Sequence, residues 1–163
     1  MFKIFRNYLI VFITLLSINS LVYAANVKLE TKDYKFYKFQ GNYEDVRVDL
    51  DYAITGRGIK VNGVSHIGDM LVRTGKDIGR TNKVFAHAEA IQFCSATLSR
   101  DMMEADPMNI VFCPYIIYIY SLPSEKDSVY VGYRKMPELD TKASKKAVAA
   151  IVKTYEGIID DAR

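Results

Sequence analysis

The stretch IQFCSATLSRDMMEADPMNIVFCPYIIYIY, residues 91–120, holds both cysteines of the chain and its most strongly strand-forming run of residues. A strand that ends at Phe93 is expected to turn into a helix over residues 96–105. Pro107 is expected to stop that helix, because proline lacks the amide N–H that a helix interior needs. A second strand is then expected over residues 115–121, where isoleucine and tyrosine alternate. The stretch therefore predicts a strand, a helix and a strand in direct succession.

Local patterns on either side supply the remaining elements. Asn42 is a good N-cap, and the apolar residues Val46, Leu50 and Ile54 follow it with helical spacing. Further strands are predicted over residues 34–40, 59–66, 84–93 and 128–134, and further helices over residues 43–57, 67–78 and 142–160. Together these elements predict an α+β domain, a two-layer sandwich with a mostly antiparallel sheet of about five strands and helices on one face. A duplication of β-α-β units is a further expectation.

Composition places the chain among globular proteins. It has 163 residues, of which 50% are apolar and 25% charged, values typical of a single domain with a buried core. The formal net charge is +3, and it falls to +1 without Lys3 and Arg6. Such a balance is too close to neutral for the basic footprint of a nucleic-acid-binding protein.

The first 24 residues have the pattern of a secretory signal peptide. Lys3 and Arg6 form a basic start, an apolar run follows over residues 8–16, and Val22-Tyr23-Ala24 resembles a cleavage site. The alternative is an uncleaved membrane anchor, which needs about 20 apolar residues; this run is shorter. The sequence therefore predicts cleavage after Ala24, export to the bacterial periplasm and no stable membrane span in the mature protein. Residues 25–33 are expected to be a polar lead-in, and residues 34–163 a single domain.

The two cysteines form a candidate disulfide or thiol site. In an exported protein, Cys94 and Cys113 would most simply form a structural disulfide, and closing a loop of about 20 residues contributes about 3 kcal/mol in the chain-entropy model. The alternative is chemical. Cys94 is expected at a helix N-terminus, where the helix dipole favours the thiolate that metal binding or redox exchange requires.

A soft metal or haem is a second hypothesis for these residues. Thiolate, thioether and imidazole ligands suit copper or haem iron. The candidate ligands are His66, His87, Cys94, Cys113 and Met70, with Met102 and Met103 as additional thioethers. The competing interpretation is that His87 bonds Glu89 on the same strand face and that the methionines fill the core. No cofactor is identified by the pattern.

Tyrosine is abundant, with 12 Tyr and no Trp in the chain. Tyr118 and Tyr120 are expected on one face of their strand. An aromatic wall with a few polar groups is typical of a small-ligand pocket, although a sheet face of tyrosines is more often an amphipathic core or an oligomer surface. The candidate ligand-binding residues are His66, His87, Glu89, Tyr118 and Tyr120.

Signatures of known enzyme classes are missing from the sequence. Gly75-Lys76 lacks the earlier glycine and the following Ser or Thr of a phosphate-binding loop, and the G-x-S-x-G and G-x-G-x-x-G motifs do not occur. No residue is therefore assigned a catalytic role.

Four segments between Tyr43 and Tyr133 resemble the bacterial and archaeal domain of unknown function 302 family. They are GIKVNGVSHIGDML, AEAIQFCSATLSRDMMEADP, CPYIIYIY and VYVGYRK. This chain has Cys94-Ser95-Ala96 where many members have Cys-Asn-Pro, and Cys113-Pro114 where they have Pro-Cys. The resemblance supports the predicted fold and implies no reaction.

The sequence thus predicts an exported small-ligand-binding or accessory module. The alternatives are a periplasmic redox protein that depends on thiols, metal or haem, and a structural homo-oligomer.

Overall fold

One antiparallel sheet of six strands organises the protein, in the order β1-β2-β6-β5-β4-β3. The computed structural model describes residues 28–163, so the predicted signal peptide lies outside the described residues. The strands are β1 (Lys28–Glu30), β2 (Tyr34–Gln40), β3 (Lys60–His66), β4 (His87–Cys94), β5 (Tyr115–Ser121) and β6 (Ser128–Arg134). The helices are α2 (Tyr43–Thr55), α3 (Ile67–Asp77), α4 (Ala96–Ala105), α5 (Lys142–Asp161) and the 3-10 helix η1 (Pro107–Phe112). The predicted α+β class is confirmed.

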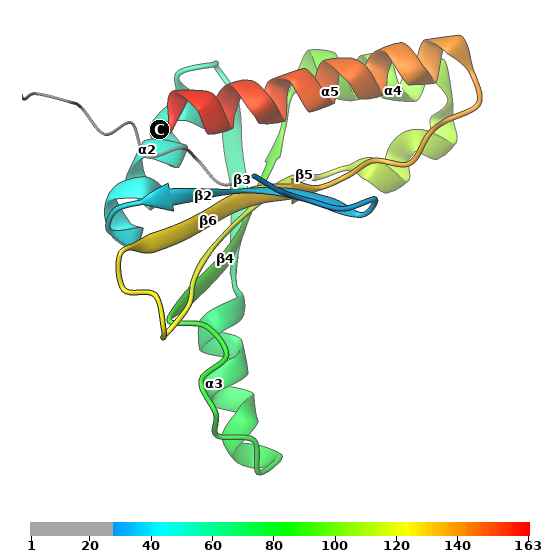
Figure 1. Ribbon diagram of the computed structural model, residues 1–163. Coiled ribbons are helices and arrows are strands. Elements are labelled where there is room, and N and C mark those ends of the chain that lie inside the picture. The colour runs from blue at the N-terminus through cyan, green and yellow to red at the C-terminus, as the bar shows by residue number, and fades with distance from the viewer. Residues whose placement is uncertain (1–27) are drawn as a thin grey trace, which may run out of the picture.

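The helices are distributed unequally between the two faces of the sheet. Figure 1 shows α4 and α5 above the sheet and α2 next to the C-terminal end of α5, whereas α3 extends from the end of β3 on the opposite side. The expectation that all helices share one face is therefore wrong for α3. The expected β-α-β duplication is also wrong, because β4 and β5 are neighbours whereas three strands separate β2 from β3.

Several boundaries differ from the sequence prediction. β1 lies within the predicted lead-in and pairs with β2. η1 starts at Pro107, so this proline begins a new helix as well as following the end of α4. β4 starts at His87, three residues later than predicted. α3 continues through Gly75 and ends at Asp77, one residue before the predicted end.

Side-chain caps fix where three helices start. Asn42 accepts a hydrogen bond from the backbone N of Glu44 at 2.8 Å, Ser95 accepts one from Leu98 at 3.5 Å, and Thr141 accepts one from Ser144 at 3.0 Å. Each cap satisfies an amide at a helix N-terminus that has no partner within the helix. The cap at Asn42 is the one that the sequence predicted.

The core lies between the sheet and α2, α4 and α5. Residues from the centre of the sheet and from two helices are fully buried there: Ile91, Ile117, Ile119, Val131, Leu50, Ile54, Ile151 and Ile158. Burying one such side chain stabilises the fold by about 1.5–3 kcal/mol. This layer therefore holds the strands in register.

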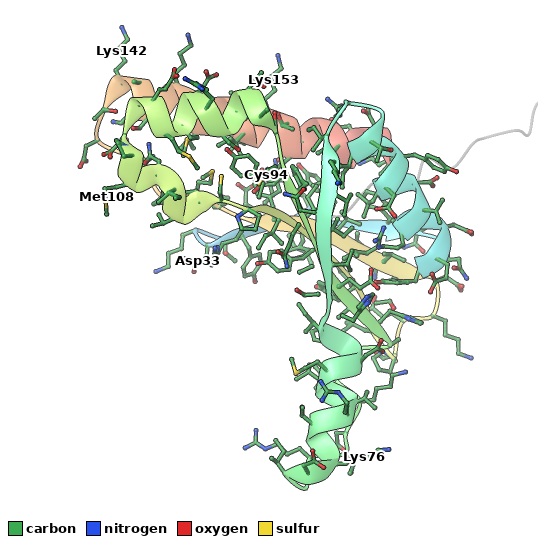
Figure 2. All side chains as sticks on the ribbon, turned by 180° about the vertical axis from the view of Figure 1, so that it is seen from behind. Asp33, Lys76, Cys94, Met108, Lys142 and Lys153 are labelled. Carbon is green, nitrogen blue, oxygen red and sulfur yellow. The ribbon has the colours of Figure 1, made fainter. Side chains whose placement is uncertain are left out.

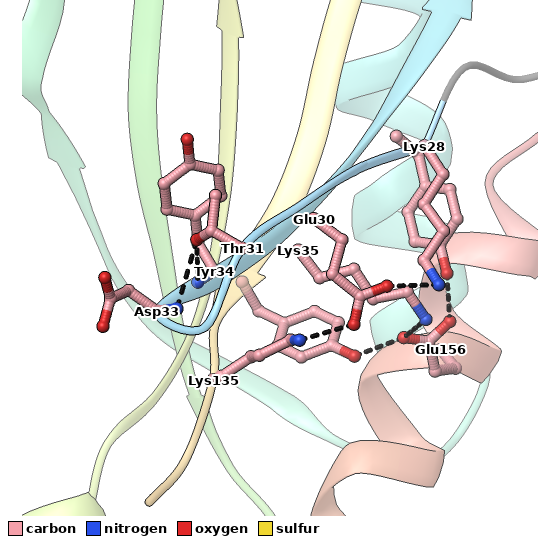
Figure 3. A network of polar contacts seen from close by, with 10 residues as sticks. Lys28, Glu30, Thr31, Asp33, Tyr34, Lys35, Lys135 and Glu156 are labelled. Atoms are coloured by element: carbon pink, nitrogen blue, oxygen red, sulfur yellow. Dashed lines mark hydrogen bonds and ion pairs between the residues drawn. The ribbon is translucent and has the colours of Figure 1, made fainter.

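A polar network beside this core ties α5 to β2 and β6 (Figure 3). Lys35 donates to Glu156 Oε1 at 2.6 Å and Tyr37 donates to Glu156 Oε2 at 2.5 Å, and Tyr133 also donates to this carboxylate. Burial raises the pKa of Glu156, but these three hydrogen bonds lower it more, so the net pKa is below the ordinary value of 4.5. Glu156 is therefore held ionised near neutral pH.

The other face of the sheet is not covered by α2, α4 or α5 and carries an aromatic cluster. Tyr120 stacks on Tyr130 with ring centroids 4.8 Å apart, and it meets Phe36 and Phe85 edge-on at 5.5 and 5.4 Å. Tyr34 extends the cluster to the edge of β2, 5.7 Å from Phe36. We call this surface the uncovered face.

Candidate functional site

The residues singled out by the sequence fall into three separate places. His66, His87 and Glu89 lie on the helix-covered side, near α2. Tyr118 and Tyr120 lie on the uncovered face, opposite Ala90 and Ala88 in the ladder of β4 and β5. Cys94 lies at the far end of β4, and Met70 lies in α3.

The first place centres on Glu89. Arg47 Nε donates to Glu89 Oε2 at 2.6 Å, and Nδ1 of His66 lies 2.8 Å from Glu89 Oε1. The side chains of Arg47 and Glu89 are only 15% and 18% exposed, whereas His66 is 60% exposed. Arg47 also pairs with Asp51 one turn along α2, at 2.6 Å. Burial lowers the pKa of Arg47, but the two carboxylates outweigh it and raise the pKa. The cluster is a fixed, charged wall with one histidine ring at its surface.

The histidine that bonds Glu89 is not the one suggested by the sequence. The sequence suggests a hydrogen bond between His87 and Glu89, because the two residues share a strand face. His66 instead stands directly opposite Glu89 in the β3–β4 register, where cross-strand side chains are closest, at about 4.5–5.5 Å between Cβ atoms. His87 stacks on Tyr43 of α2, with ring centroids 4.6 Å apart and an angle of 20° between the planes.

Tyr43 and His87 line a cavity of about 320 Å³ between the start of α2 and the loop that follows β5. Ser121 and Lys126 are also part of its lining. The side-chain hydroxyls of Tyr43 and Ser121 are buried and have no hydrogen-bond partner among the described residues. Burial raises the pKa of Tyr43, and the charge of Glu89 adds to this effect, so the phenol stays protonated. The lining of the cavity therefore includes an imidazole and two residues whose hydroxyl groups are buried and unpaired.

The second place is the thiol pair. Cys94 and Cys113 are both free and half-buried. Phe93 pairs with Tyr115 in the β4–β5 ladder, so one further step places Cys94 opposite Pro114, the chain neighbour of Cys113. The two thiols are close enough for Cys113 to act on the pKa of Cys94. Burial raises the pKa of the Cys94 thiol, and the neighbouring Cys113 thiol raises it further. The expectation of a lowered pKa for Cys94 is therefore wrong, because burial and a second thiol act on it. Cys113 also donates to Ser99 Oγ at 3.5 Å.

The proposed metal ligands are not brought together. His66 pairs with Glu89 and Lys60 pairs with Cys94 at the other end of the same ladder, a separation of about 17 Å at 3.4 Å per residue. Among residues 28–163, no group of three or more His, Cys, Asp or Glu side chains is placed to hold a metal ion. Met102 is fully buried in the core, as the competing interpretation suggested.

The third place is the uncovered face. Tyr118 lines a cavity of about 240 Å³ with Ile116, Pro114 and Arg134. Tyr120 belongs instead to the aromatic cluster. The two tyrosines thus lie on the same face, as predicted, but with different surroundings.

The candidate site residues predicted from the sequence do not include three residues that the structure places around Glu89 and the cavity: Tyr43, Arg47 and Ser121. Tyr43, Arg47 and Asp51 follow each other at intervals of four, which places them on one helix face and is a signal that was available. Ser121 has no such signal, because only its register with His87 in the β4–β5 ladder brings it to this place.

Among the helices of residues 28–163, none combines the length and the apolar character needed to cross a membrane.

Comparisons with known proteins identify the family. No curated protein matches the sequence significantly. The fold matches the crystal structure of an uncharacterised conserved protein DUF302 from Bacillus stearothermophilus, with a TM-score of 0.67 and 15% sequence identity over 80% of this chain and 98% of that one. At that identity the match shows the fold alone. The model of the family described as domain of unknown function DUF302 matches residues 36–162. The chain therefore belongs to the DUF302 family.

Proposed function

We propose that the protein is an exported accessory module that binds a small polar ligand in the cavity lined by Tyr43, His87 and Ser121. One observation carries the proposal: Tyr43 and Ser121, whose buried hydroxyl groups have no hydrogen-bond partner among the described residues, line the same cavity.

Unpaired buried hydroxyls are costly, and this supports a ligand. Leaving one without a hydrogen bond costs about 1–3 kcal/mol, and such groups are rare in folded proteins. A ligand that bonds the hydroxyls of Tyr43 and Ser121 would recover this energy. The volume of about 320 Å³ is at the lower end of the range of about 300–1,000 Å³ for ligand pockets. The ligand is therefore small.

The charges around the cavity narrow the ligand class. Glu44, Glu125 and Lys126 all line it, and Glu125 already pairs with Lys38 at 2.6 Å. A simple anion would meet two carboxylates, and a simple cation would meet a lysine. A zwitterion or a neutral polyhydroxylated molecule fits both signs, with the exposed His87 ring as a further hydrogen-bonding group.

The charged wall behind the cavity supports binding rather than chemistry. Arg47 and Glu89 hold each other, and Glu89 is close enough to Tyr43 to influence its pKa. These contacts fix the position of α2 over β4, so the cavity is shaped before a ligand enters. We assign no residue a catalytic role.

The two histidines provide a direct test. His66 and His87 are the only histidines of the chain, so their imidazole NMR signals can be assigned with His66→Gln and His87→Gln. Free amino acids, neutral monosaccharides and polyols are titrated in turn. We expect at least one of these probes to shift the His87 signal in a saturable manner.

Matched variants decide whether the hydroxyls bind. Tyr43→Phe and Ser121→Ala should each weaken binding of that probe by about tenfold, the effect of one lost hydrogen bond. Tyr52→Phe on the exposed side of α2 and Ser124→Ala are the controls. Unchanged binding by Tyr43→Phe and Ser121→Ala, or no shift of His87 with any probe, would refute the proposal.

A second candidate function rests on the thiol pair. Two adjacent free thiols can exchange with a disulfide donor: one thiolate attacks the donor and releases one donor thiol, and the second cysteine then attacks the mixed disulfide and releases the other. Cys94 and Cys113 would end as a disulfide, with the donor reduced to two thiols. In this case the module is a redox protein of the periplasm.

Mass spectrometry tests whether the two thiols react with a disulfide donor as a pair. After incubation with oxidised glutathione, the mass of the wild-type protein should fall by that of two hydrogen atoms. Neither cysteine should then react with a thiol reagent. Cys94→Ser should keep a single glutathione adduct on Cys113. A wild-type protein with two stable adducts would show that the thiols cannot reach each other.

A structural homo-oligomer, the remaining alternative, would use the uncovered face and neither of these places.

A further inference from the structure

We propose that two copies of the chain form a symmetric dimer in which the α3 arm of each copy packs on the uncovered face of the other. We define the α3 arm as residues 67–84, which comprise α3 and most of the segment that returns to β4.

The arm projects from the body of the protein. Figure 1 shows α3 pointing away from the sheet on the side opposite α4 and α5, and Figure 2 shows Lys76 near its tip, remote from the other labelled residues. Only Gly68 and Gly75 are buried within α3. The body of the chain therefore leaves most of this helix without packing.

Close backbone contacts hold the arm in this direction. A Cβ atom on Gly68 would come within 3.0 Å of the backbone N of Ala88, so the first turn of α3 rests directly on β4. A Cβ atom on Gly75 would come within 2.3 Å of the carbonyl oxygen of Arg80, and Arg80 N donates to Gly75 O at 2.8 Å. The return segment is thus packed against the helix, and the arm is a defined structure.

The arm exposes apolar side chains. Ile67, Met70, Leu71 and Ile78 recur with helical spacing, which places them on one stripe. Large apolar side chains of the arm are between 37% and 66% exposed: Met70, Leu71, Val72, Ile78 and Val84. A helix with such a stripe normally buries it against another surface.

The uncovered face is the matching surface. It carries the aromatic cluster of Phe36, Phe85, Tyr120 and Tyr130 with Tyr34 at its edge, and Tyr34 is 43% exposed. Aromatic residues are enriched at the centre of protein–protein interfaces. Lys38, whose Nζ lies 5.5 Å from the centroid of the Tyr130 ring, already has its charge paired by Glu125. The arm borders this face where Gly68 approaches Ala88, and Phe85 just after the arm packs on Tyr120. Because α3 itself points away from the sheet (Figure 1), it leaves the rest of this face open.

A dimer would bury both the exposed apolar stripe of the arm and the uncovered face. A two-fold axis makes each arm contact the other copy's face, so one contact is repeated twice and the assembly closes. The four strands β2, β6, β5 and β4 form a face of about 440 Å² at 4.8 Å between strands and 3.3 Å per residue. The 11-residue helix α3, about 16 Å long and about 10 Å wide, adds about 160 Å². These surfaces offer at most about 600 Å² per partner, which is the lower end of the range for a specific interface.

Sedimentation of the purified full chain over a range of concentrations tests the proposal. Wild-type protein should be a dimer. Leu71→Glu on the arm and Tyr34→Glu on the uncovered face should each raise the dimer dissociation constant by at least about tenfold. Val48→Glu on the outer side of α2, where the side chain is 49% exposed, is the control and should remain dimeric. Circular dichroism confirms that each variant is folded.

Mixing the two variants tests the exchange of arms. A mixed dimer of Leu71→Glu and Tyr34→Glu chains retains one contact between a native arm and a native face, so the mixture should dimerise more strongly than either variant alone. A monomeric wild type, or a dimer that Leu71→Glu leaves intact, would overturn the proposal. A monomer that sediments with vesicles of anionic phospholipid, and loses this through Leu71→Glu, would assign the arm to a membrane surface instead.

Discussion

The Nδ1 atom of His66 lies 2.8 Å from Oε1 of Glu89, and the two residues stand opposite each other in the β3–β4 ladder. Glu89 thereby links β3, β4 and, through Arg47, the helix α2. One carboxylate holds three elements together at the end of the sheet where the cavity opens.

Replacing this carboxylate should destabilise the fold. In Glu89→Gln, the largely buried Arg47 keeps only Asp51 as a charged partner, and we expect a loss of about 1–3 kcal/mol in the free energy of unfolding. Urea denaturation measures it. Glu104→Gln is the control, because its exposed pair with Arg100 at 2.6 Å contributes at most about 1 kcal/mol. Equal effects of the two substitutions would contradict the prediction.

The Glu156 network should make stability depend on acid pH. The pKa of Glu156 is lowered below its ordinary value of 4.5 in the folded protein. A lowered carboxylate pKa contributes stability above the unfolded value and loses it as pH falls through the folded value. Between about pH 5 and pH 3, wild-type stability should therefore fall more steeply than that of Glu156→Gln.

Thermal unfolding across this pH range measures the difference. Glu138→Gln, which removes an exposed carboxylate 3.2 Å from Lys145, should follow the wild-type profile. Parallel profiles for wild type and Glu156→Gln would show that the network does not set the acid stability.

Gly132 allows β2 and β6 to approach each other. A Cβ atom there would lie 2.2 Å from the carbonyl oxygen of Lys35 and 2.5 Å from Cγ of Phe36. Gly132→Ala should therefore cost about 2 kcal/mol or more, because backbone atoms must move. Gly63→Ala meets nothing within 4 Å and should be tolerated. Chemical denaturation compares the two variants, and a neutral Gly132→Ala would contradict this packing.

The N-terminal segment should be removed on export. The Val22-Tyr23-Ala24 site after a short apolar run motivates cleavage before Ala25. The intact mass of protein recovered from the periplasm of an expressing bacterium checks it. A mass that includes residues 1–24 would indicate a retained segment.

The elements that were predicted correctly are those with local signals. The helix Ala96–Ala105 and the strand Tyr115–Ser121 occur as predicted, because a capping serine and the alternation of side chains determine them within a few residues. Elements that depend on distant partners were missed. β1 pairs with β2, and its Glu30 forms an ion pair with Lys135, more than 100 residues away in the sequence.

Gly75 shows why a single residue type can mislead. In sequence it suggests the end of a helix, since glycine disfavours helix interiors. In the structure it makes room for the carbonyl oxygen of Arg80, which no local pattern encodes.

The candidate site also depends on contacts between residues that are distant in the sequence. His66, Glu89 and Arg47 come from three elements, and only strand register and helix packing unite them.

The two edges of the sheet are poor templates for further strands. The edge strand β1 has only three residues, two of them charged, and the opposite edge strand β3 changes register between Val61 and Gly63. Short, charged or bulged edges resist the edge-to-edge pairing that leads to amyloid-like aggregation. The bulge in β3 thus protects an otherwise open sheet at high concentration, and a substitution that straightened it would be expected to promote fibre formation before any loss of the native fold.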